Sequence, residues 1–146
     1  LGIEWNLLSL DDAELDALAA VVALHRRFRP LFHSGDQVRF DTEEAYVAHG
    51  VYATDRSEAL VSFACVASAI SLKPPPFLLP GLDADRRYRV THVALPGERG
   101  GLNRTRPVWF DEGVDITGDW LAQLGLQLPA MHPETAVLLH LVAPDA

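Results

Sequence analysis

The sequence predicts a mainly β protein, an antiparallel β-sandwich of about seven or eight strands preceded by one amphipathic α-helix. Two features lead to this prediction. The spacing of hydrophobic residues changes after Pro30 from a period of about 3.6, typical of helices, to about 2, typical of strands. Turn signals then recur at intervals of roughly 8–12 residues. With 146 residues, of which 49% are hydrophobic, the chain is long enough for one domain to bury its own core.

The helix is expected over about residues 10–28. It begins at a capping box, Ser9-Leu10-Asp11-Asp12, in which the Ser9 hydroxyl can accept from a free backbone N–H and the Asp12 side chain can reach back. Pro30 is expected to end it, after a basic last turn where the helix dipole favours cations. Between these ends, one apolar stripe recurs at helical spacing: Leu15, Leu18, Ala19 and Val22.

A long β-hairpin is expected after the helix. Residues 37–40 alternate polar and apolar, and two extended runs, Tyr46–Thr54 and Ala59–Ile70, flank a polar turn at residues 55–58. The predicted core face of the second run holds Val61, Phe63, Cys65, Ala67 and Ala69. The Cys65 thiol is therefore expected to point inward as a small hydrophobe rather than to act as a nucleophile.

The rest of the chain is expected to alternate short strands with turns. Strands are predicted at residues 77–79, 87–95, 108–110, 126–128 and 135–142, with a proline-rich connection at residues 73–76 and a helical turn at residues 118–125. Residues 96–107 form a locally basic loop, for which simple solvation and a partner or interdomain contact are the alternatives. The glycosylation sequon at Asn103 has no other sign of secretion beside it.

Charge and composition exclude several functions. A formal charge of −8 argues against nucleic acid as the main partner, because phosphate binding needs a basic surface. No apolar run reaches the roughly 18–20 residues of a membrane span. Cys65 is the only cysteine, so no internal disulfide supports an oxidising compartment, and a cytoplasmic location is expected. The chain begins at Leu1 without Met or a signal peptide, which favours a piece cut from a longer protein.

No catalytic, substrate-binding or metal-ligating residue is assigned. Helix capping, turn formation and solvation account for the adjacent acids, which are Asp11/Asp12, Asp83/Asp85 and Asp111/Glu112. The histidines lack the spacing of a zinc site and are scattered at His25, His33, His49, His92, His132 and His140. No nucleophile elbow, P-loop or dinucleotide fingerprint occurs, and no cofactor is expected.

Several blocks, taken together and in order, give the chain a more specific resemblance. They are residues 1–7, residues 26–31 with Ser34-Gly35, residues 55–60, residues 79–90, residues 118–121 and residues 125–129. In these blocks, which are spread over residues 1–129, the chain resembles the microbial α-galactosidases of glycoside hydrolase family 36.

The resemblance implies two parts. Residues 1–30 correspond to the loop and last helix of a truncated (β/α)8 catalytic barrel, and residues 31–146 to the C-terminal antiparallel β-sandwich. The family's aspartate nucleophile and aspartate acid/base lie on barrel strands upstream, so neither carries over to this chain. Asn6 stands where the family often has Asp. Glu4 and Trp5 are candidates to border the sugar pocket, because the opening loop would lie at the C-terminal face of the barrel; loop anchoring is the simpler interpretation.

Three hypotheses follow for the function. In the first, the chain is a non-catalytic C-terminal domain that buttresses the catalytic barrel of a retaining α-galactosidase, and in the isolated chain its helix stripe is covered by the same sandwich or by a second copy. In the second, Tyr88, Trp109 and Trp120 form an aromatic platform of a carbohydrate-binding module. In the third, the chain is an enzyme by itself, for which no acid/base pair is supported.

Overall fold

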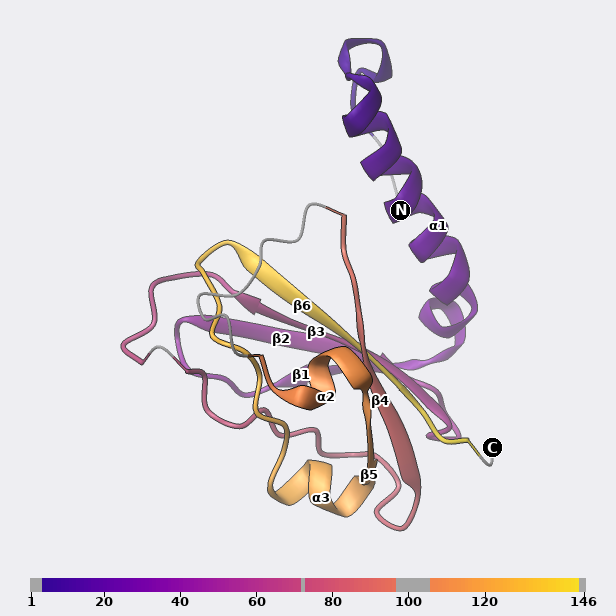
Figure 1. The fold of residues 1–146 in the computed structure, drawn as a ribbon. Coiled ribbons are helices and arrows are strands. Elements are labelled where there is room, and N and C mark those ends of the chain that lie inside the picture. The colour runs from indigo at the N-terminus through magenta and orange to yellow at the C-terminus, as the bar shows by residue number, and fades with distance from the viewer. Residues whose placement is uncertain (1–3, 72, 97–105, 145–146) are drawn as a thin grey trace.

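The computed structural model describes residues 4–71, 73–96 and 106–144. Within these ranges, a long helix packs against one face of a six-stranded antiparallel sheet with strand order β1-β2-β3-β6-β4-β5 (Figure 1). The strands are β1 (Asp36–Phe40), β2 (Tyr46–Tyr52), β3 (Glu58–Cys65), β4 (Arg87–Val93), β5 (Val114–Thr117) and β6 (Thr135–Val142). The helices are η1 (Leu7–Ser9), α1 (Asp12–Ser34), α2 (Val108–Glu112) and α3 (Gly118–Gln123). Leu1 to Ile3 and most of the basic loop, with Asn103, lie outside the described residues.

The predicted hairpin is present as β2 and β3. Its register pairs Tyr46 with Cys65 and Tyr52 with Ala59. The last strand, β6, inserts between β3 and β4, so that Phe63 of β3 pairs with Val137. The last strand in the sequence therefore lies in the centre of the sheet, between β3 and β4.

The inner face of the sheet carries the main core, as the alternation predicted for residues 61–65, whereas beyond the end of β3 Ala67 of the predicted face is exposed and Ala69 is half-buried. Val61, Phe63 and Cys65 are all buried on it. A second layer covers this face: Phe77 forms an isolated bridge with Leu126, and α3 lies beside the segment around Leu79. The mainly β class with a preceding helix is thus confirmed, and the named strands together with the two bridge segments supply the predicted extended elements except the one at residues 108–110.

Local differences from the expected strands have physical causes. Residues 108–110 form helix α2 rather than a strand, because Pro107 sets the chain at the helix start and Gly113, with φ 72°, ends it. The run predicted to continue to Ile70 leaves the sheet after Cys65, where the neighbouring strand β2 also begins. The short edge strand β5 was not predicted, because its four residues are too few to display a period.

The N-terminal helix begins and ends later than predicted. The capping box joins Asp11 and Glu14, whose side chains each accept from the other's backbone N–H at 2.9 and 2.8 Å, whereas the Ser9 hydroxyl donates to Asn6 within η1. Pro30 does not end the helix, which continues to Ser34. An interior proline costs about 3 kcal/mol, and burial of the apolar side chains on either side of it offsets this cost.

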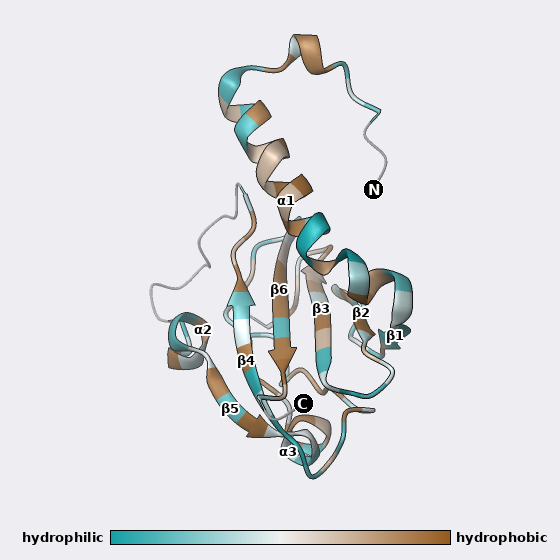
Figure 2. Ribbon diagram, turned by 90° about the vertical axis from the view of Figure 1, so that its right-hand side faces the viewer, coloured by the Kyte–Doolittle hydropathy of each residue, from teal (hydrophilic) through white to brown (hydrophobic). Residues whose placement is uncertain are grey.

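Those buried side chains attach the C-terminal half of α1 to the outer face of the sheet. Phe28 and Leu31 form a second, smaller core cluster with Val51 of β2 and Leu60 of β3. The Phe28 ring also meets His140 of β6 edge-on, with ring centroids 4.9 Å apart. In Figure 2 this half of the helix crosses the sheet, while the N-terminal half rises clear of it.

Candidate functional site

The three aromatic residues considered for a sugar platform do not form one. Tyr88 is fully buried in the core. Trp109 is half-buried, and its indole N–H donates to the carbonyl of Gln127 at 3.1 Å. Trp120 on α3 is 52% exposed. Because a platform must present its rings side by side to solvent, the structure leaves Trp120 as the one exposed ring of the three.

At least one member of each acidic pair has a structural contact. Asp11 caps α1, and Asp83 accepts from the backbone N–H of Asp85 and lies 3.4 Å from the guanidinium of Arg86. Asp111 lies 3.9 Å from Arg106. Nowhere in the described part of the chain do three histidine, cysteine, aspartate or glutamate side chains gather closely enough to hold a metal ion. None of its helices is long and apolar enough to cross a membrane.

A polar cluster fixes the turn of the β2–β3 hairpin. Arg56, at φ 61°, donates to the carboxylate of Asp36 at 2.6 Å. The Tyr88 hydroxyl donates to the Arg56 carbonyl at 2.8 Å and accepts from the Asp83 N–H at 3.1 Å. The hydroxyl of Tyr52 donates to the Pro80 carbonyl. Burial raises the pKa of both tyrosines, since a phenolate is poorly solvated there.

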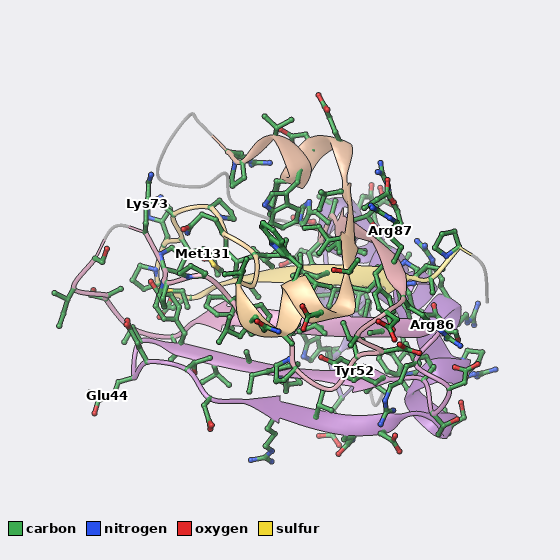
Figure 3. All side chains as sticks on the ribbon, turned by 90° about the horizontal axis from the view of Figure 1, so that it is seen from below. Glu44, Tyr52, Lys73, Arg86, Arg87 and Met131 are labelled. Atoms are coloured by element: carbon green, nitrogen blue, oxygen red, sulfur yellow. The ribbon has the colours of Figure 1, made fainter. Side chains whose placement is uncertain are left out.

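The same turn is bonded to the segment that precedes β4. Hydrogen bonds from the Ser57 hydroxyl, at 2.7 Å, and from its N–H lower the pKa of the Asp55 carboxyl. Arg86 donates to the Asp55 carbonyl at 2.9 Å, and Figure 3 shows it at the same end of the sheet as Tyr52. Two blocks that carry the family resemblance, residues 55–60 and 79–90, therefore meet, and their contacts are structural.

The N-terminal half of α1 is a surface without a covering element in the described structure. A shallow apolar groove runs along it, lined by Leu15, Leu18, Ala19, Val22, Ala23 and Arg26. These residues include the whole predicted stripe. Leu24 packs against the smaller core cluster on the sheet. Leu15 of the stripe is nine residues from Leu24, or about two and a half turns, and so lies on the opposite side of the helix. The stripe therefore faces away from the side of the helix that packs on the sheet, and the same sandwich does not cover it.

Charge is segregated along this helix. The N-terminal end carries only acids, and the C-terminal half carries basic and histidine side chains without an acid; these are Asp11, Asp12, Glu14 and Asp16 against His25, Arg26, Arg27, Arg29 and His33. The macrodipole favours this order within one helix. It also gives the exposed surface one negative end and one positive end.

The residues before α1 extend the same exposed surface. Glu4 and Trp5, the candidates for a place near a sugar pocket, are exposed. Leu8 in η1 is 98% exposed. The side-chain oxygen of Asn6 accepts from the Leu8 N–H at 3.2 Å and caps η1, a role that an aspartate there would also perform.

A second apolar groove lies between α1 and the outer face of the sheet. Val21, Leu24 and Phe32 form its helix side, and Val51 and Leu60 are part of its floor. Sequence reasoning missed this groove, because it arises only where the helix meets the strands.

Comparisons with known proteins agree with this architecture. The family model "Glycosyl hydrolase family 36 C-terminal domain" matches residues 46–141. An α-galactosidase from Escherichia coli is 32% identical over 147 residues, a match that covers 97% of this chain and 21% of the relative.

Solved structures of α-galactosidases contain a region with the same fold as this chain. A variant of a family 36 α-galactosidase from Geobacillus stearothermophilus, solved with raffinose, is 25% identical with a TM-score of 0.71, over 94% of this chain and 17% of that one. An α-galactosidase from Lactobacillus brevis shares the fold at 18% identity, with a TM-score of 0.71, over 96% of this chain and 18% of that one. The chain thus spans about a fifth of the relatives it matches. It belongs to the C-terminal domain family of glycosyl hydrolase family 36.

Proposed function

We propose that this chain acts as the non-catalytic C-terminal domain of an α-galactosidase that removes terminal α-galactosyl residues. The match to the family's C-terminal domain over residues 46–141 supports this role. Asp11 caps α1, and Asp83 and Asp111 lie close to arginines, which is consistent with chemistry performed by another domain. Cys65, a free and buried thiol, supports a reducing compartment, and we infer a cytoplasmic location.

The domain is proposed to contact the catalytic domain through the N-terminal half of α1. In this assignment residues 1–30 form the last loop and helix of the catalytic barrel, and residues 31–146 form the sandwich. The observation that carries the proposal is the apolar stripe around Leu18, which faces away from the sheet. Because α1 continues without a break from Asp12 to Ser34, one rigid helix would join the two parts. Self-association through the same helix is the other proposed use of this surface.

A chimera tests the proposal. The matching C-terminal residues of the Escherichia coli α-galactosidase are replaced by this chain, and hydrolysis of a chromogenic α-galactoside is measured. We expect an active enzyme, and at least a tenfold loss of folded, active protein for Leu18→Asp, because a charge would be buried in the contact. The matched control, Leu124→Asp on an exposed leucine away from α1, should retain activity.

Two results would contradict the proposal. Turnover of the chromogenic substrate by the 146-residue chain alone would make it an enzyme in its own right. Equal activity of the Leu18→Asp and Leu124→Asp chimeras would remove the stripe from the contact. The sugar-binding alternative is tested separately by titrating the chain with galactose and raffinose, for which we expect no saturable change in tryptophan fluorescence.

A further inference from the structure

We infer that two copies of the 146-residue chain pair through the N-terminal halves of α1, with the helices antiparallel. The inference rests on the proposal above that the stripe is a contact surface, and it adds the occupant in the chain by itself. The stripe alone would not identify a partner. The segregation of charge along the helix does, because a helix with an acidic and a basic end is complementary to an inverted copy of itself.

An antiparallel pair centred between Ala20 and Val21 places stripe against stripe. At this register Ala19 lies level with Val22 of the partner subunit, and Leu15 with Arg26 of the partner subunit. The alanines in the stripe allow the two helices to approach closely. The free half of the helix, from Asp12 to Arg26, is about 22 Å long at about 1.5 Å per residue, enough for about four turns of contact.

The same register pairs the charges. Asp12 lies level with Arg29 of the partner subunit, and symmetry repeats the pair at the other end of the seam. A parallel pair would instead place the acidic ends together and the basic ends together. The charges therefore select the antiparallel arrangement.

The sheet does not obstruct the partner. It packs on the face of α1 that holds Phe28 and Leu31, half a turn from the stripe. The antiparallel arrangement also brings η1 of each copy to the level of Phe32 of the partner subunit.

Sedimentation equilibrium measures the association. Over ~1 μM to ~1 mM of the chain, we expect the mass to rise from one copy to two, as a small interface gives weak binding. Leu18→Asp should weaken the dimer at least tenfold, and the Leu124→Asp control should not. Higher salt should weaken it as well, because the paired charges are exposed.

A charge exchange tests the partner choice. One variant carries Asp12→Lys and Asp16→Lys, and the other carries Arg26→Glu and Arg29→Glu. Each alone opposes like charges and should dimerise at least tenfold more weakly than the parent chain. An equimolar mixture should restore the dimer, because the reversed acidic half of one variant then meets the reversed basic half of the other. Circular dichroism verifies that α1 is retained in both variants.

Disulfide trapping tests the direction of the helices. Leu15→Cys mixed with Arg26→Cys should form a mixed disulfide. Leu15→Cys alone should not, because its two copies lie about 16 Å apart along the seam. Cys65 does not compete, since it is buried.

Three results would overturn the inference: one mass at all concentrations, no recovery in the mixed variants, or a Leu15–Leu15 disulfide in place of the mixed one. None of these measurements uses enzymatic activity. A failure here would leave the α-galactosidase proposal standing, and an inactive chimera would leave the dimer standing.

Discussion

Tyr52 and Tyr88 show how single side chains fix the hairpin turn. Both rings are fully buried, and each hydroxyl donates to a backbone carbonyl, Tyr52 to Pro80 and Tyr88 to Arg56. The sequence offered Tyr88 as a platform residue because an aromatic side chain can be a surface or a core residue. Burial decided between the two, and it also raises the pKa of both phenols.

Stability should therefore fall in alkali. The folded protein keeps the Tyr52 phenol neutral while the unfolded chain ionises it near pH 10, so its contribution is complete below about pH 10 and is lost as the pH rises above that value. Tyr52→Phe should cost about 0.5–1.5 kcal/mol at pH 7, the worth of the lost hydrogen bond, and flatten the alkaline decline. Urea unfolding at pH 7 to 11 measures both effects, and parallel alkaline curves for the variant and the parent would contradict this account.

Helix α1 has two apolar faces, one that packs on the sheet and one that no described element covers. Its existence was predictable, because an acidic first turn, an apolar stripe and a basic last turn are local features. The stripe around Leu18 and Val22 was also visible in the sequence. The second apolar face, around Phe28 and Leu31, was not recognised, because Pro30 lies between these two residues and suggested a helix end. The structure places the unrecognised face on the sheet and leaves the recognised one open.

The attachment of α1 should depend on Phe28. Phe28→Ala should cost about 3–5 kcal/mol, because the side chain is 2% exposed and holds the helix against Leu60. Phe32→Ala, four residues later and 37% exposed, should cost less than about 1 kcal/mol. Chemical denaturation gives both values, and cleavage of α1 by a protease should accelerate in the first variant alone. Similar losses in the two variants would show that the smaller cluster does not secure the helix.

For the molecule as a whole, the central position of β6 determines when the sheet can be completed. This strand comes last in the sequence but pairs with β3 and β4 in the middle of the sheet. Its inner-face residues Val137, Leu139 and Leu141 are buried. The sheet therefore cannot be complete until the end of the chain is in place, and its centre should be its most stable part.

Hydrogen exchange should follow this order. Backbone amides of β3 and β6, bonded on both sides, should exchange most slowly, at the rate of global unfolding. Amides of residues 16–22 in α1 should exchange much faster in dilute protein, because no other described element packs on that half of the helix. Equal protection of the two regions at low concentration would contradict this division. Slower exchange in α1 at high concentration is expected if the helices pair.

Patterns among neighbouring residues sufficed to predict the first helix, the β2–β3 hairpin and the bounds of β6, and the order of the resembling blocks indicated the family. Only the packed structure shows that β6 lies at the centre of the sheet, that Tyr88 is core, and that the stripe of α1 is uncovered. Hydrophobic periodicity records which face of an element is apolar. It does not record what covers that face, because the covering residues are distant in the chain and their contact is fixed only when the layers pack.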